Sequence, residues 1–186
     1  MNPTLHAVMA YEDLSIAKIA KEKWDYLVHT LNGFDFELCL WKFDALRIPE
    51  LRAVAVNDAI KAQMVFVATH GTGELPSEVK VWIEQWLNRT EQKRDAARLL
   101  TLLSDPLPDK SGISAFSQFA YLQQVARKGA MDFLVSTAAQ RDPVFVSFHM
   151  NAKNADSTVR QLTLPAHQPD PDCGNKRADP RKTRDR

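Results

Sequence analysis

The stretch at residues 63–86 reads QMVFVATHGTGELPSEVKVWIEQW, and it decides the fold that we expect. Residues 64–68 form a short apolar run with β-branched side chains, which is typical of a strand buried on both faces of a parallel sheet. Gly71 and Gly73 follow in a loop, and Pro76 suits the first turn of a new helix. Open α/β folds build ligand sites from a buried strand, a loop and a helix N-terminus, so the stretch predicts where a site would lie.

Strand and helix patterns alternate along most of the chain. We expect strands at 5–11, 34–40, 64–68, 97–103 and 131–135, and helices at 16–31, 51–62, from Pro76 to Leu87, and from Phe119 to Gly129. This alternation indicates an α/β fold with three layers, in which helices cover both faces of a parallel sheet. Residues 34–40 alternate apolar and polar side chains as an edge strand does, which favours the flavodoxin-like strand order 2-1-3-4-5.

The character of the chain changes after Thr137. We expect the α/β domain to occupy residues 1–137 and an accessory segment to occupy 138–164, with a further strand within 143–150. Residues 165–186 are crowded with Pro, Asp, Lys and Arg and cannot bury much apolar surface. This composition predicts a disordered polar tail.

Composition excludes several classes of protein. The chain has 186 residues, with 24 Lys and Arg against 23 Asp and Glu, so a nucleic-acid partner is not expected. No apolar run has transmembrane length and the N-terminus lacks signal-peptide features, which predicts a cytoplasmic protein that does not bind membranes. Cys39 and Cys173 lie far apart, so neither a metal knuckle nor a CxxC motif exists, and no metal site is expected.

Candidate site residues follow from the expected topology. Ligands in this fold bind at the carboxyl ends of the first and third strands. The residues that fall there are Glu12, Asp13, Ser15, residues 69–74, Ser104 and Asp105. Glu12 and Asp13 are most simply acids that cap a helix, whereas His70 is either a general acid or base or a loop histidine bonded to nearby backbone.

The loop after the third strand resembles that of flavodoxins, and Pro76, Val79, Lys80, Ile83, Glu84 and Trp86 resemble a helix of NADPH-dependent FMN reductases. This resemblance implies an FMN cofactor whose isoalloxazine ring faces Thr69, His70, Gly71, Thr72 and Gly73. By the same resemblance Ser15 would be a phosphate ligand. Flavodoxins have a Ser-, Thr- and Gly-rich phosphate loop after the first strand, but residues 11–16 read YEDLSI. Two carboxylates there would repel the FMN phosphate, and a helix dipole compensates only about half a charge.

The chain also resembles response-regulator receiver domains, which share this fold. Glu12 and Asp13 match their acidic pair, which can hold Mg²⁺ through carboxylate oxygens. However, Thr69 and His70 stand where the phosphorylated aspartate is expected, and no lysine ends the last strand. A phosphorylatable receiver is therefore excluded, and a degenerate relative stays open.

Two functions remain at this stage. The acidic first loop favours a non-catalytic signalling or ligand-binding domain, whose partner is a small molecule or a protein. The third-strand loop favours the alternative, an FMN-binding or NAD(P)H-dependent flavin oxidoreductase-like protein. The sequence indicates neither the ligand nor the oligomeric state.

Overall fold

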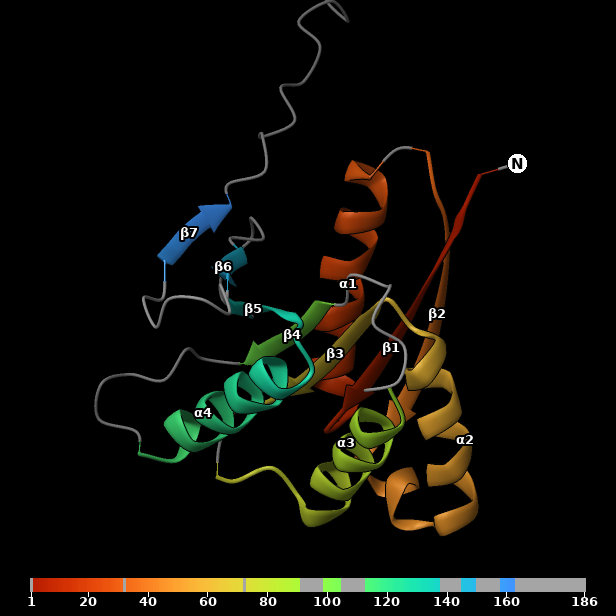
Figure 1. The fold of residues 1–186 in the computed structure, drawn as a ribbon, viewed down its shortest axis with the longest axis vertical. Helices are drawn as coiled ribbons and strands as arrows, with labels where there is room; N and C mark the ends of the chain where they lie inside the picture. Colours follow the sequence, from red (N-terminus) through yellow and green to blue (C-terminus); the bar gives the residue numbers. More distant parts are fainter. Residues whose placement is uncertain are drawn as a thin grey trace, which may run out of the picture.

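The structure is a computed structural model that describes residues 2–31, 33–71, 73–90, 99–104, 113–137, 145–149 and 158–162. Strands and helices alternate from the N-terminus (Figure 1). The strands are β1 (Thr4–Tyr11), β2 (Asp35–Lys42), β3 (Met64–Thr69), β4 (Leu99–Ser104), β5 (Asp132–Thr137), β6 (Phe145–His149) and β7 (Thr158–Leu162). The helices are α1 (Leu14–Thr30), the short 3₁₀ helix η1 (Phe43–Arg47), α2 (Pro49–Lys61), α3 (Ser77–Thr90) and α4 (Ile113–Lys128).

The sheet has the order β2-β1-β3-β4-β5-β6-β7. The first five strands are parallel, which confirms the predicted order 2-1-3-4-5 and is consistent with a flavodoxin-like fold. The accessory strand expected within 143–150 is β6, which pairs antiparallel with β5. The antiparallel strand β7 was not expected, and it extends the sheet beyond the five strands that the sequence indicates. The predicted tail at 165–186 lies outside the described residues.

The helices cover the two faces of the sheet unequally. In Figure 1, α2, α3 and α4 lie on one side of the sheet and α1 lies on the other. The α1 face packs Ile16, Ala20, Trp24 and Leu27 against β-strand residues such as Phe66. The spacing of these four residues by three and four is the pattern that predicts the helix, and Gly33 takes the expected left-handed conformation just after it, with φ of 91°.

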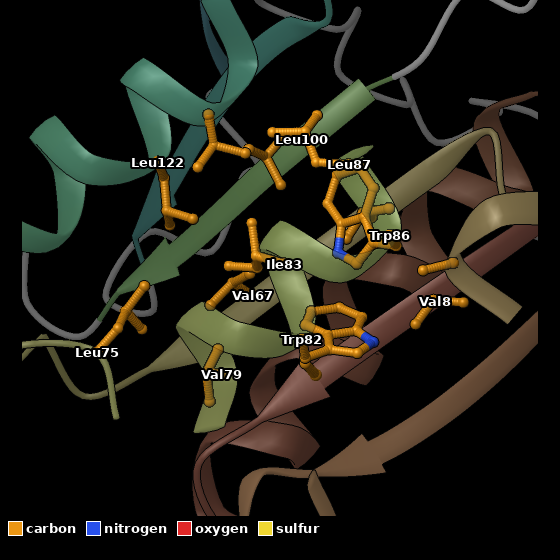
Figure 2. Packing of buried hydrophobic residues seen from close by; sticks show 14 of the residues in the cluster. Val8, Val67, Leu75, Val79, Trp82, Ile83, Trp86, Leu87, Leu100 and Leu122 are labelled. Carbon is orange, nitrogen blue, oxygen red and sulfur yellow. The ribbon is translucent and has the colours of Figure 1, made fainter. Parts of the chain in front are cut away.

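Two tryptophans of α3 occupy the centre of the larger core. Trp82 and Trp86 are fully buried between the sheet and the neighbouring helices (Figure 2). Their rings meet edge to face, with centroids 6.1 Å apart. This packing fixes α3 on the sheet, and with it the loop that leads from β3 into α3.

The edge strand differs in detail from the prediction. The alternation places Phe34, Phe36, Leu38 and Leu40 on one side of the strand. Phe36 and Leu38 pack into the core on the α1 face, but Phe34 and Leu40 are 40% and 50% exposed. Trp41 was expected to follow the strand, and it lies inside β2, where its indole N–H donates to Asp58 Oδ2 over 3.1 Å. The strand is longer than the alternation implies because residues beyond Leu40 continue in register with β1.

Candidate functional site

The loops that follow β1 and β3 meet at the carboxyl edge of the sheet. The two strands are parallel neighbours, with Tyr11 in register with Ala68. The backbone N–H of Glu12 donates to the carbonyl of Ala68 over 3.0 Å, which extends the pairing into the first loop. The residues after each strand are therefore brought together, as the topology predicts.

Asp13 caps α1 and uses the amides of its first turn. The residue has extended backbone angles, and its Oδ1 accepts the N–H groups of Ser15 and Ile16 over 2.9 and 3.1 Å. Its carbonyl accepts the N–H of Ala17 over 3.0 Å. The Ser15 and Ile16 amides are thus bonded to the Asp13 carboxylate, and they are free first-turn amides of the kind that an anionic ligand at this helix N-terminus would need.

These contacts hold Asp13 in its ionised form. The Ser15 hydroxyl and the Ile16 amide lower the pKa of this carboxyl well below its ordinary value, with smaller contributions from His70 and the Ser15 amide. The carboxylate is about half exposed, so it also places a full negative charge at the surface of the site.

Glu12 does not cap the helix, in contrast to the prediction. Its Oε2 accepts the hydroxyl of Thr69 over 2.7 Å and the backbone N–H of His70 over 2.9 Å. The side chain extends from the β1 loop to the β3 loop. The helix begins directly after Asp13, and the Asp13 carboxylate already accepts the free amides of the first helical turn. The two acids therefore have separate roles, one at the helix and one at the neighbouring loop.

His70 joins the same cluster through one ring nitrogen. Its Nε2 lies 3.0 Å from Asp13 Oδ2 and 3.1 Å from Ser15 Oγ. The ionised carboxylate can only accept, so Nε2 carries the proton in this arrangement. The Ser15 hydroxyl donates instead to Asp13 Oδ1 over 2.6 Å. The expected bonding of His70 to nearby backbone is not what the structure shows, because its ring and its N–H contact the side-chain oxygens of Asp13, Ser15 and Glu12.

Ser15, His70 and Asp13 do not form a catalytic triad. In a triad the histidine accepts the serine proton on one nitrogen and donates to the carboxylate from the other. Here the Ser15 hydroxyl and the Asp13 carboxylate both contact His70 Nε2, and the Ser15 hydroxyl donates its hydrogen to the carboxylate. The cluster consequently lacks an activated nucleophile.

The β3 loop needs its glycines. Gly71 and Gly73 have φ of 73° and 83°, which other residues rarely adopt. The Gly71 N–H lies 3.3 Å from the Thr69 hydroxyl oxygen, and the Gly73 carbonyl accepts from Gln118 Nε2 over 2.8 Å. Gln118 was not predicted. The sequence feature that could have identified it is its spacing. It lies four and seven positions before the buried Leu122 and Val125 of α4, which places this polar residue on the core face of the helix.

The structure brings most of the predicted site residues together. Ser15, Thr69, His70 and Gly71 belong to one network with Glu12 and Asp13, while Gly73 is tied to α4. Ser104 is buried at the end of β4, in register with Thr69. Thr72 and Asp105 lie outside the described residues.

In the part of the chain that the structure describes, no cluster of three or more His, Cys, Asp or Glu side chains could hold a metal ion. None of the described helices has both the length and the apolar character needed to cross a bilayer. The chain matches no protein-family model, and no curated protein is significantly similar to it.

Proposed function

We propose that this protein is a non-catalytic ligand-binding or signalling domain whose site lies at the carboxyl ends of β1 and β3. The observation that carries the proposal is the position of the Asp13 carboxylate. It takes the α1 amides that a phosphate would bind and adds a negative charge that would repel one. The absence of an activated nucleophile among Ser15, His70 and Asp13 supports a binding role over a catalytic one.

The surface around the carboxylate suggests the chemistry of the partner. Leu14, the residue after Asp13, is 75% exposed, and Ser15 is exposed as well. An apolar side chain next to a carboxylate and a hydroxyl suits a neutral or positively charged group with an apolar part. A basic and apolar segment of a protein partner has that chemistry, whereas a nucleotide does not.

FMN binding is the second candidate, because one observation favours it. The left-handed Gly71 and Gly73 give the β3 loop the backbone freedom that a ring-binding loop needs, and this loop lies beside the N-terminus of α1. In this alternative the flavin site is intact at its ring end and is blocked at its phosphate end.

A flavin titration separates the two candidates. The visible spectrum of the purified protein is recorded first, and then quenching of FMN fluorescence is followed as protein is added. We expect a colourless protein and little or no FMN binding. A yellow protein, or tight FMN binding by the unaltered chain, would refute the proposal and favour the oxidoreductase-like alternative.

Variants of the first loop extend the test. Asp13→Ser keeps a side chain that caps helices while it removes the charge, and Asp13→Asn keeps the shape. Glu12→Gln, alone and combined with Asp13→Ser, removes the second charge. Riboflavin, which lacks the phosphate, is the matched control ligand. A gain for FMN alone would identify a flavin-shaped site disabled by its acids, and no binding of either flavin would leave the domain to act through its surface.

A further inference from the structure

Positive charge is concentrated in residues 176–186, which we call the basic segment. Its sequence, KRADPRKTRDR, contains six Lys and Arg residues against two Asp, which gives a net charge of +4. The whole chain has a net charge of +1, so the remaining residues hold 18 basic and 21 acidic side chains and a net charge of −3. The basic segment is therefore attracted to acidic parts of the rest of the chain, over a range that salt shortens.

The site at β1 and β3 offers an ionised carboxylate with room for a further donor. The Asp13 side chain is about half exposed. Its Oδ1 accepts three hydrogen bonds, whereas its Oδ2 accepts from His70 alone among the described residues. A carboxylate oxygen has two lone pairs, so Oδ2 can accept a second donor such as a guanidinium N–H. The cation Lys42 lies near Asp13, but its ammonium is paired with Asp44 over 2.6 Å.

The direction of β7 brings the following residues to the same edge of the sheet. β6 is antiparallel to β5, and β7 is antiparallel to β6, so β7 runs in the same sense as the five parallel strands. Leu162 therefore ends β7 at the carboxyl edge, where β1 and β3 also end. Residues 163–186 lie outside the described residues, and they follow from this edge.

The distance to the site matches the length of chain between β7 and the basic segment. β7 lies four strand positions from β3 and five from β1, which corresponds to about 19–24 Å along the sheet. Residues 163–175 separate Leu162 from the basic segment, and a coil of that length has a root-mean-square span of about 18–22 Å. A tethered group reaches its highest effective concentration when the span of the tether matches the distance to the site.

We propose that the basic segment docks within its own chain on the site at the carboxyl ends of β1 and β3, where its guanidinium groups bind the Asp13 carboxylate. This inference rests on the proposed function, because the segment then competes with the basic partner that the site would bind. An exposed ion pair contributes little by itself, and the tether supplies the local concentration that a separate peptide lacks. The contact is autoinhibitory, since a partner must displace the segment to reach Asp13.

A spin label on Cys173 reports the position of the segment. Cys173 lies three residues before the basic segment, and Cys39→Ser leaves it as the single cysteine of the chain. A nitroxide attached to Cys173 in the full chain broadens the amide signals of residues that it approaches in a proton–nitrogen correlation spectrum. The same sample with the nitroxide reduced supplies the reference intensities, and circular dichroism should show that the labelled protein is folded.

The docked segment predicts a localised loss of signal. The amide signals of Ser15, Ile16 and His70 should lose intensity, because these residues surround the Asp13 carboxylate. Asp35 and Gln63 lie at the amino ends of β2 and β3, so their signals should not change. Unchanged signals around Asp13, or an equal loss over the whole domain, would overturn the proposal.

Charge variants identify the contact. Asp13→Asn keeps the shape of the helix cap and should reduce the broadening about twofold to fivefold, the effect of losing one exposed ion pair. Glu22→Gln is the matched control, because it removes an exposed acid of α1 more than two turns beyond the site and should change nothing. Broadening that Asp13→Asn and Glu22→Gln reduce equally would contradict docking at Asp13.

A variant of the segment itself leaves the described part of the chain unaltered. Arg181, Lys182 and Arg184 are replaced together by Gln, which removes three of the six positive charges. The broadening near Ser15 should be lost in this variant, and also in the unaltered segment at about 1 M salt, where the screening length is about 3 Å. Broadening that survives both changes would show that the contact is not ionic.

A mixed sample tests whether the segment docks on its own chain. Spin-labelled protein without nitrogen-15 is mixed with nitrogen-15 protein that lacks the spin label. We expect no broadening in the mixture. Broadening equal to that in the singly labelled protein would overturn docking within one chain and place the segment on a second copy.

The outcome can be separated from that of the flavin titration. A protein that binds no FMN and shows no broadening near Asp13 would overturn this inference and leave the proposed function unaffected. Tight FMN binding by the unaltered chain would refute the proposed function, and the autoinhibitory role of the segment with it.

Discussion

The backbone N–H of His70 donates to Glu12 Oε2 over 2.9 Å, and this bond connects the loop after β3 to the residue that follows β1. The same oxygen accepts the Thr69 hydroxyl over 2.7 Å. Because β1 and β3 are neighbours in the sheet, Glu12 closes the gap between two loops at its carboxyl edge. The conformation of the β3 loop thus depends on an acid in a different part of the sequence.

We expect Glu12→Ala to destabilise the protein by about 1–2 kcal/mol, because it leaves a buried hydroxyl and a backbone amide without their acceptor. Glu12→Gln should cost less, since its amide oxygen can accept both hydrogens. Urea unfolding measures the difference. Thr69→Val should lose less stability in the Glu12→Ala background than in the wild type, and equal losses in both backgrounds would show that the two residues are not coupled.

The ionised Asp13 predicts a pH dependence of stability. Contacts with the Ser15 hydroxyl and the Ile16 amide lower its pKa in the folded state from the ordinary value of 3.8. A group whose pKa is lowered by folding stabilises the folded state above the unfolded pKa, and that stabilisation is lost as the pH falls toward the folded pKa. Asp13→Asn keeps the shape of the cap but does not ionise.

The melting temperatures of wild type and Asp13→Asn should therefore differ by a constant amount above about pH 5. The difference should shrink as the pH is lowered through 3.8, the ordinary pKa of aspartate. Thermal unfolding followed by circular dichroism at a series of pH values measures it. A difference that stays constant down to about pH 3 would mean that another group is responsible.

The strands and helices of residues 1–137 could be predicted from the sequence because their signals are local and strong, and the alternation in residues 34–40 favoured the strand order. The apolar run before Thr69 and the spacing of Ile16, Ala20, Trp24 and Leu27 each determine an element on their own. β7 could not be predicted, since the polar residues around Thr158–Leu162 lack the alternation or apolar run that marks a strand. Its pairing with β6 depends on the position of a neighbouring strand.

The closeness of the candidate residues could be predicted, but their bonding could not. Parallel topology alone places Ser15 and His70 at one edge of the sheet. The different roles of Glu12 and Asp13 follow from the start of the helix at Leu14. Asp13 directly precedes the helix, so its carboxylate, and not that of Glu12, accepts the free amides of the first turn. The sequence treats the two acids as equivalent, whereas their side chains bind different loops.

Trp82 predicts an unusual result in the core. Its side chain is fully buried, and its indole nitrogen has no hydrogen-bond partner among the described residues. Trp82→Ala should cost about 3–5 kcal/mol through the lost packing and the cavity. Trp82→Phe should cost less than about 2 kcal/mol, because it fills much of the space and removes an unsatisfied donor. Urea unfolding of both variants tests this, and a cost of Trp82→Phe well above about 2 kcal/mol would indicate that the indole N–H is satisfied.

The end of α4 places its glycine one position before the left-handed residue. The N–H of Ala130 donates to Arg127 and that of Met131 donates to Ala126, over 3.2 and 2.9 Å, and together these bonds form a Schellman motif. Glycine usually occupies the left-handed position of this motif, but here Ala130 does, with φ of 50°. The sequence indicates that Gly129 stops the helix, whereas the turn itself is made by Ala130.

Exchanging the two residue types should consequently have opposite effects at adjacent positions. Ala130→Gly should stabilise the protein by about 0.5–1 kcal/mol, because relief of the left-handed strain exceeds the added entropy of the unfolded chain. Gly129→Ala should destabilise it only mildly, since the new Cβ would lie 2.7 Å from Met131 Cε and 2.9 Å from Leu87 Cδ1, the ends of two flexible side chains that would have to move within the core. Chemical denaturation of both single variants and the double variant measures these changes. If Ala130→Gly lowered stability, the strain at Ala130 would be smaller than the entropy that glycine adds to the unfolded chain. Only the Gly129→Ala variant would then test the contacts made by the new Cβ.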